Sequence, residues 1–138
     1  MLLCDSAQAV NNKLYVLGGG WDVIGPGSPS AIALKLDVPW DKTNQKHHFE
    51  LTLEDADGQP VGVAVPPDDA IGLIKIEGDV EVGRPVGVPE GTPLSTCNLG
   101  PLPLAPGRYV WKLVINGLAD WNWQLPFAVH GLQFARST

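Results

Sequence analysis

The chain is predicted to be an all-β protein, an antiparallel β-sandwich of about eight strands. Apolar and polar residues alternate with a period of two over several short segments, and no segment keeps a period of 3.6 residues. The 138 residues also include 16 glycines and 13 prolines. Because proline removes a backbone donor and glycine weakens helix interiors, this composition favours short strands joined by many turns. Strands at short, regular spacing predict two antiparallel sheets packed face to face.

The N-terminal part is expected to open with a hairpin. Residues 2–10 and 13–17 are the two arms, and Asn11-Asn12 is the turn. Gly18-Gly19-Gly20 then ends the second arm, and residues 25–30 form a loop. In residues 31–39, Ile32 and Leu34 belong to an apolar face, while Lys35 and Asp37 lie on the other face.

Two hairpin turns have specific sequence signals. Phe49, Leu51 and Leu53 alternate with polar residues up to the turn Asp55-Ala56-Asp57-Gly58, after which residues 59–65 return. Asn116-Gly117 matches a type I′ turn between residues 108–115 and 119–130.

Two further segments complete the predicted strands. Residues 71–82 form an extended stretch with a bulge or bend expected at Gly72 and Gly78, and residues 94–104 contain prolines that predict an edge strand. Trp111, Trp121 and Trp123 are in phase with aliphatic neighbours and are expected in the core.

Residues 1–138 are expected to form a single domain, with residues 130–138 as a tail.

Charge and composition disfavour some partners. The net charge is −6, with nine basic residues among fifteen acidic ones, so no basic face is expected for nucleic acid or an anionic membrane. The first residues, Met-Leu-Leu-Cys-Asp, lack the positive region of a signal peptide, and a cytoplasmic location is expected. Cys4 and Cys97 are far apart in the sequence and are expected to be free, buried thiols, with a disulfide as the alternative.

No motif predicts catalytic, cofactor-binding or metal-binding residues. His47 and His48 are neighbours on a strand, so their side chains should point to opposite faces and not converge on one metal. Asp55 and Asp57 resemble the start of a calcium loop, but the later oxygen ligands are missing, which favours a turn. Asp68-Asp69 specifies no site, and Gly18-Gly19-Gly20 lacks the continuation of a phosphate-binding loop.

Two tryptophans are the candidate ligand or partner contacts. Trp21 is followed by Asp22 and Trp40 by Asp41, and both pairs lie at expected strand ends. An exposed tryptophan beside polar groups can stack on a sugar ring or anchor a protein partner. The alternative is that each ring anchors its loop on the rim of the sandwich.

Several short strings resemble an uncharacterised family of small bacterial proteins of unknown function. They are Leu2-Leu3-Cys4-Asp5, Gly20-Trp21-Asp22, Val38-Pro39-Trp40, Asp55-Ala56-Asp57-Gly58, Val82-Gly83-Arg84-Pro85 and Pro106-Gly107-Arg108-Tyr109-Val110-Trp111. The resemblance covers residues 2 to about 129. It implies an immunoglobulin-like sandwich in a bacterial protein, with no assigned reaction and no catalytic residues to transfer.

Three functions are consistent with the sequence, and the first is favoured. It is a non-catalytic protein-interaction or self-assembly module, with a protein partner or a homo-oligomer, because the chain has few charges and proline-rich edges. The second is a carbohydrate- or small-ligand-binding module that uses Trp21 and Trp40. The third is a hydrolytic enzyme, which sequence alone does not exclude because catalytic groups pair in space.

Overall fold

Strands form most of the structure, a computed structural model that describes residues 1–11, 13–25, 27–65, 70–81, 90–91 and 94–131. These residues form fourteen strands and one short 3-10 helix. The strands are β1 (Leu2–Cys4), β2 (Ser6–Val10), β3 (Lys13–Leu17), β4 (Val23–Ile24), β5 (Ala31–Lys35), β6 (Val38–Pro39), β7 (Lys46–Asp55), β8 (Gly62–Val65), β9 (Ala70–Leu73), β10 (Lys75–Glu81), β11 (Glu90–Gly91), β12 (Leu94–Asn98), β13 (Gly107–Ile115) and β14 (Leu118–Val129), and the helix is η1 (Trp40–Lys42). The prediction of an all-β fold is confirmed.

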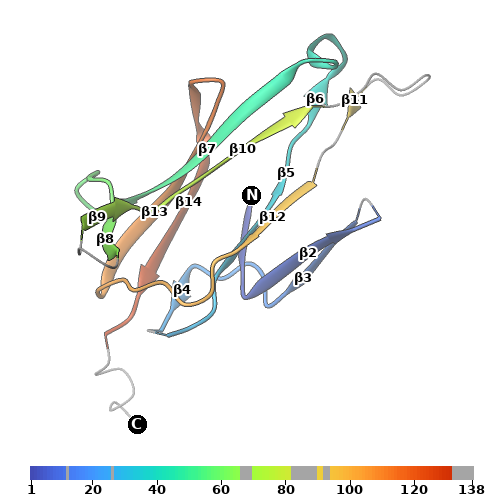
Figure 1. Cartoon of the computed structure of the whole chain (residues 1–138). Helices are drawn as coiled ribbons and strands as arrows, with labels where there is room; N and C mark the ends of the chain where they lie inside the picture. The colour runs from blue at the N-terminus through green and yellow to red at the C-terminus, as the bar shows by residue number, and fades with distance from the viewer. Residues whose placement is uncertain (12, 26, 66–69, 82–89, 92–93, 132–138) are drawn as a thin grey trace.

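Two sheets face each other as a sandwich. One has five strands in the order β10-β7-β13-β14-β4, and the other has three in the order β1-β5-β12 (Figure 1). Together they contain eight of the fourteen strands. Their pairings are antiparallel, as predicted, except at one edge, where β4 pairs with β14 in parallel. The proline-rich segment provides the edge strand β12, as predicted, but this strand already ends at Asn98.

The main core fills the space between these two sheets. Its members come from alternate positions of the facing strands and are at most 7% exposed: Leu3, Ile32, Leu34, Phe49, Leu51, Leu53, Trp111, Leu113, Phe127 and Val129. Trp111 on β13 is fully buried. The alternation that predicted β7 places Phe49, Leu51 and Leu53 in this core, so the period-two pattern reports the buried face correctly.

A third layer covers the outer face of the three-stranded sheet. The β2–β3 hairpin lies beside this sheet, on the side away from the five-stranded sheet (Figure 1). Between hairpin and sheet lies a second small core of Cys4, Ala7, Ala31 and Ala33, and Leu14 packs against it. Strand β5 is therefore buried on both faces. The small side chains of this second core allow the hairpin to approach the sheet closely. Their spacing in the sequence did not predict that a hairpin would cover this face.

The two predicted turns are confirmed. Asn116 and Gly117 have φ angles of 51° and 78°, as a type I′ turn between β13 and β14 requires. At the end of β7, Asp55 O accepts the N–H of Gly58 at 3.0 Å, and Gly58 has φ of 77°. Glycine is suited to this position because other residues are strained at positive φ.

The prediction of a bulge or bend at Gly78 is wrong. Gly78 lies in the continuous pairing of β10 with β7, directly opposite Phe49. A Cβ at this position would lie 3.1 Å from two carbons of the Phe49 ring. Glycine therefore provides space for the aromatic ring instead of bending the strand.

Tyr109 connects the start of β13 to the preceding loop. Its hydroxyl donates a hydrogen bond to the carbonyl of Ala105 at 2.6 Å, and its ring stacks on Phe127 with centroids 5.8 Å apart. A tyrosine that bonds backbone a few residues upstream is the form of the tyrosine corner seen in sandwich folds. This contact ties the loop before β13 to the core.

The two cysteines lie on opposite sides of β5. Cys4 on β1 is paired with Ala31, and Cys97 on β12 is paired with Ile32. Two strands separated by a third lie about 10 Å apart, too far for the roughly 7 Å limit between Cα atoms in a disulfide. Both cysteines are free, Cys4 is buried, and Cys97 is half-buried.

The C-terminal end of β14 is tied to β4. The N–H of His130, at the start of the expected tail, donates to the carbonyl of Ile24 at 2.9 Å and so continues the contact with β4. Residues 132–138 lie outside the described part of the chain. Within that described part, the structure contains no helix with the length and apolar composition that a bilayer crossing requires.

Candidate functional site

Trp21 anchors the segment before β4 on the main core. Its ring meets Phe127 edge-on, with centroids 6.1 Å apart and planes at 80°. Gly20, with φ of 88°, precedes it, as expected for a bend that turns Trp21 into the sandwich. Asp22 is exposed, and its carbonyl accepts the N–H of Ala128 at 2.8 Å. These contacts correspond to the loop-anchor alternative.

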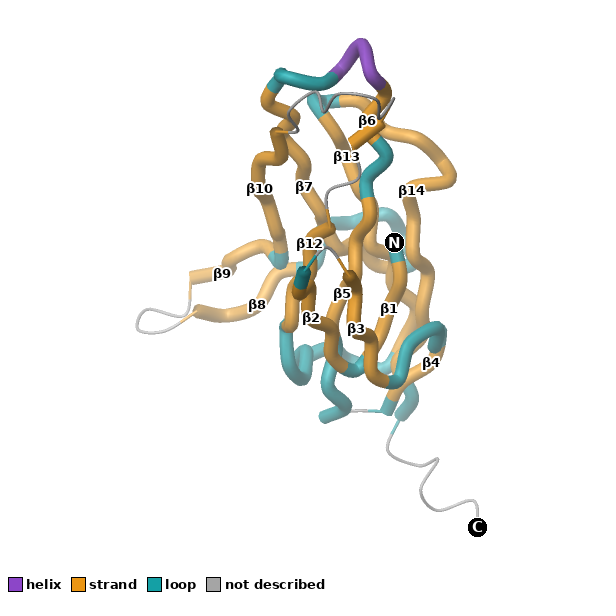
Figure 2. The backbone as a smooth tube through the Cα atoms, turned by 90° about the vertical axis from the view of Figure 1, so that its right-hand side faces the viewer, coloured by secondary structure: helices purple, strands orange, loops and turns teal. Residues whose placement is uncertain are grey.

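Trp40 and Asp41 lie in η1, at the other end of the sandwich from β4 (Figure 2). Asp41 is exposed, and its carbonyl accepts a hydrogen bond from Gln45 Nε2 at 3.2 Å. The side chain of Trp40 lies outside the described part of the structure. The two predicted Trp-Asp pairs are therefore separated and do not form one site.

An apolar groove lies at the η1 end of the sandwich. It has a volume of about 400 Å³. Its apolar lining, which defines the groove below, is Leu36, Val38, Pro39, Val80, Ile115, Leu118 and Trp123. These residues come from β6, β10 and the β13–β14 hairpin, and from the segment between β5 and β6. The size falls within the range of ligand pockets.

Trp121 lies on the surface of this hairpin, on β14, contrary to the prediction that it packs in the core. Its side chain is 80% exposed, and that of Leu118 is 69% exposed. The cause is a break in register: Lys112 pairs with Gln124, but Val114 pairs with Ala119, so β14 bulges over residues 120–123 (Figure 2). Period-two alternation stops predicting the buried face inside such a bulge. Trp111 is in the core as predicted, and Trp123 is partly buried and packs against that core.

The two adjacent histidines point to different surroundings, as predicted. His47 lines the side of the groove, where Asn116 Nδ2 donates to its Nδ1 at 2.9 Å and its Nε2 lies 2.8 Å from the carbonyl of Lys42. His48 contacts side chains on β7 and β10. The pair therefore does not converge on one ion.

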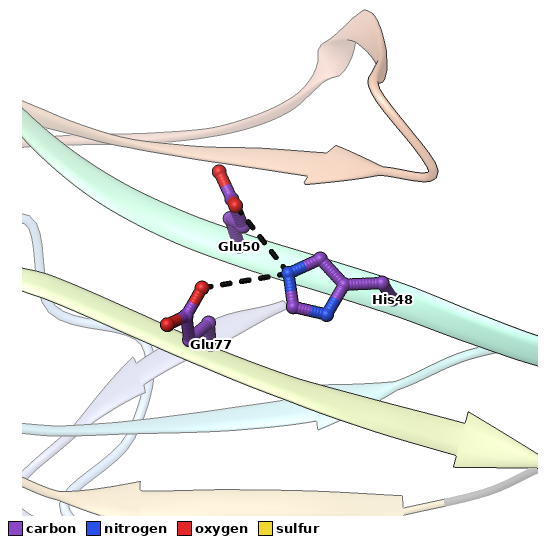
Figure 3. Close-up of side chains that lie close together, drawn as sticks. All are labelled: His48, Glu50 and Glu77. Carbon is purple, nitrogen blue, oxygen red and sulfur yellow. Dashed lines mark hydrogen bonds and ion pairs between the residues drawn. The ribbon is translucent and has the colours of Figure 1, made fainter.

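His48 is at the centre of a charged cluster on the outer face of the five-stranded sheet (Figure 3). We use the name His48 cluster for His48, Glu50, Lys75, Glu77 and Asp79. The Nε2 atom of His48 lies 3.3 Å from Glu50 Oε1 and 3.4 Å from Glu77 Oε2, and its Nδ1 atom lies 3.0 Å from Asp79 Oδ1. Lys75 Nζ lies 3.3 Å from the same Glu50 oxygen and 3.5 Å from the same Glu77 oxygen.

The pairing of β10 with β7 brings these residues together. Asp79 is opposite His48, and Glu77 is opposite Glu50. Side chains at alternate positions share a face of a strand, so two pairs in register form one patch. The sequence shows that His48 and Glu50 share a face, but the partner strand and its register are not visible in it. Sequence reasoning missed the cluster for that reason.

The charged groups of the cluster stabilise one another's ionised forms. The hydrogen bond to Asp79, followed by the one to Glu50, raises the pKa of His48 above its usual 6.5. Hydrogen bonds from Lys75 and His48 lower the pKa of Glu50 below its usual value, and Glu50 in turn raises the pKa of Lys75. Side-chain exposures run from 34% for Glu50 to 55% for Glu77, so solvent screens these interactions.

The other motifs considered from sequence have structural roles or lie outside the described residues. Asp55 Oδ1 accepts the N–H groups of Asp57 and Gln59 at 2.9 and 3.0 Å, which stabilises the turn after β7, as the turn interpretation requires. Asp68-Asp69 lies outside the described part of the chain.

A protein-family model described as a family of unknown function (DUF6941) matches residues 1–130. The chain therefore belongs to this family, in agreement with the resemblance noted in its sequence. No curated protein matches the chain in a sequence search.

Proposed function

We propose that this member of the DUF6941 family is a protein-binding module whose contact surface is the apolar groove together with exposed Trp121. The partner is an extended protein segment that places one or two large apolar side chains in the groove and packs against Trp121. The observation that carries the proposal is an apolar cavity of about 400 Å³ lined by Leu118, which is 69% exposed, together with Trp121, which is 80% exposed on the same strand, β14.

Tryptophan is the residue type most enriched among those that dominate binding energies at interfaces. Trp121 is held by a bulge, in which Asp120 Oδ1 accepts the N–H of Asn122 at 2.9 Å. A ring presented on an ordered backbone loses less conformational entropy on binding. The Asn116-Gly117 turn next to Leu118 also fixes one side of the groove.

The compartment proposed for this interaction is the bacterial cytoplasm. It is supported by the use of both cysteines as free thiols, because proteins of oxidising compartments more often use cysteines in disulfides. Fractionation of host cells with antibody detection would test this. Recovery in a periplasmic or secreted fraction would contradict it.

The test is an affinity pull-down from the native host, read by mass spectrometry, with the mass of the purified protein measured by light scattering. Wild type is compared with Trp121→Ser and Leu118→Ser. Leu17→Ser is the matched control, because Leu17 is 70% exposed but lies on β3, in the hairpin of the third layer. We expect a stoichiometric partner or a discrete oligomer that Trp121→Ser and Leu118→Ser abolish and Leu17→Ser retains.

Two results would overturn the proposal. One is a strict monomer with no reproducible partner in the lysate. The other is a partner that both groove variants retain, or that Leu17→Ser loses equally.

A small apolar ligand or a carbohydrate is the second candidate, favoured by the size and the mainly apolar lining of the groove. Trp123 lines it, so a bound ligand would change tryptophan fluorescence. The measurement is a fluorescence titration with a glycan panel and a panel of apolar small molecules. A change that Trp123→Phe removes would support ligand binding, and an unchanged spectrum across both panels would eliminate it.

A further inference from the structure

We infer that His48, Glu50 and Glu77 form a binding site for a divalent transition-metal cation, with Zn²⁺ as the best fit, and that Asp79 positions the histidine for it. The site lies on the outer face of the five-stranded sheet, and the groove proposed for the partner is lined by other residues. The inference therefore does not depend on the proposed function.

The donor atoms have the chemistry and spacing that the ion requires. One imidazole nitrogen and two carboxylate oxygens lie within 4.8 Å of one another. Zinc binds such ligands at about 2.0–2.2 Å, so two donors at the tetrahedral angle lie roughly 3.4 Å apart. His48 Nε2 lies 3.3 Å from Glu50 Oε1 and 3.4 Å from Glu77 Oε2.

The orientation of the imidazole matches that of a metal ligand. Its Nδ1 lies 3.0 Å from Asp79 Oδ1, and its Nε2 faces Glu50 and Glu77. In the neutral imidazole with its proton on Nδ1 donated to Asp79, Nε2 carries the free lone pair, so the ion would replace the Nε2 proton of the charged form. A carboxylate on the far nitrogen of a metal-bound histidine is a recurring arrangement that fixes the tautomer and makes the ligand more basic.

The backbone holds the histidine in place. The N–H of His48 donates to Asn116 Oδ1 at 2.9 Å, and its carbonyl accepts the N–H of Asn116 at 2.7 Å. Glu50 follows on the same strand, and Glu77 is directly opposite Glu50 on β10. All three ligands are therefore on paired strands, which position donors more accurately than loops do.

Lys75 is the internal competitor for the ion. Its ammonium group lies within 3.5 Å of both carboxylate oxygens, so it occupies the position that a metal ion would take between them. The ammonium group pairs with the two carboxylates, whereas Zn²⁺ can be coordinated directly by all three donors. The Lys75 side chain is 39% exposed and can move to solvent when the ion binds.

The imidazole decides which ions are expected. Mg²⁺ and Ca²⁺ prefer all-oxygen sites, whereas imidazole suits Zn²⁺, Ni²⁺ and Cu²⁺. Three protein ligands also leave a position for water or for a carboxylate from another molecule.

The test is titration of the full-length, tag-free protein with Zn²⁺ by calorimetry, with Mg²⁺ and Ca²⁺ in parallel. We expect one Zn²⁺ per chain, and binding at least about 10-fold weaker in His48→Asn and Glu77→Gln. Asp79→Asn should weaken binding by about 10- to 100-fold, as loss of such positioning carboxylates does. Lys75→Met should strengthen it several-fold, because the competing charge is gone.

His47→Asn is the matched control, since it removes the neighbouring histidine, whose ring has different partners. Circular dichroism checks the fold of every variant, and the visible spectrum of bound Co²⁺ reports nitrogen and oxygen ligation independently of affinity. Equal Zn²⁺ binding by wild type and His48→Asn would overturn the inference. So would loss of binding in His47→Asn, or Mg²⁺ or Ca²⁺ binding as tight as that of Zn²⁺.

Discussion

Asp79 on β10 lies directly across the strand pair from His48 on β7, and its Oδ1 lies 3.0 Å from the imidazole Nδ1. This contact links two neighbouring strands on the outer face of the five-stranded sheet. It is the largest cause of the raised pKa of His48. The relationship depends on register, because a shift of one residue would place the two side chains on opposite faces.

Asp79→Asn should lower the pKa of His48 in the metal-free protein. Because the folded-state pKa is above the usual 6.5, the contribution of His48 to stability is complete below about pH 6.5 and is lost as the pH rises through the folded pKa. The measurement is an NMR titration of the ring protons in the presence of a chelator. Asp57→Asn, in the turn after β7, is the control, and an unchanged His48 pKa in Asp79→Asn would contradict the assignment.

Two tryptophans should differ sharply in their effect on stability. Trp111 is fully buried, and Trp111→Ala should lower the free energy of unfolding by about 3–5 kcal/mol, the usual cost of such core truncations. Trp121 is 80% exposed, so Trp121→Ala should change it by no more than about 0.5 kcal/mol. Urea unfolding measures both values, and similar losses for the two variants would place Trp121 in the core after all.

Gly78→Val should destabilise the sheet although valine favours strands. A Cβ at this position would lie 3.1 Å from the Phe49 ring, and overpacking of this kind costs about 1–3 kcal/mol. If the ring is the cause, Phe49→Leu should reduce the cost of Gly78→Val in a double-mutant cycle. Additive losses would show that the two positions do not share one packing space.

Ala33→Leu should loosen the third layer. Ala33 is 3% exposed and lies between the three-stranded sheet and the β2–β3 hairpin, so a larger side chain should cost about 1–3 kcal/mol. Hydrogen exchange of the hairpin amides should rise more than that of β7 and β13. Ala9→Leu, at an exposed position of the same hairpin, is the control and should leave both measurements nearly unchanged.

Stability should fall at alkaline pH as Tyr109 ionises. Burial, with a smaller contribution from Asp55, raises the pKa of Tyr109 above its usual 10. The neutral phenol is thus favoured in the folded protein, so its stabilisation is complete below about pH 10 and is lost as the pH rises through the folded pKa. Absorbance titration of Tyr15→Phe follows Tyr109 alone, since the chain has two tyrosines.

In Tyr109→Phe, the hydrogen bond to Ala105 is also lost, at a cost of about 1 kcal/mol near neutral pH. The alkaline loss of stability should be smaller in this variant. An equal alkaline loss in wild type and Tyr109→Phe would assign it to another group.

Local chemistry made part of the fold predictable. The Asn116-Gly117 and Asp55–Gly58 turns were identified because few residue types adopt positive φ without strain. The alternation of Phe49, Leu51 and Leu53 identified a strand and its buried face. Trp121 was misplaced because the same alternation continues through a bulge that depends on pairing with β13.

By itself, the sequence determined that this protein consists of strands, where several of them turn, and which faces of regular strands are apolar. These properties follow from backbone sterics and from side chains a few residues apart. Only the tertiary structure decided that the hairpin of β2 and β3 covers β5, that Trp121 is exposed, and that Glu77 and Asp79 face His48. These features depend on which strands pair, and in which register, between segments far apart along the chain, and no local pattern specifies that choice.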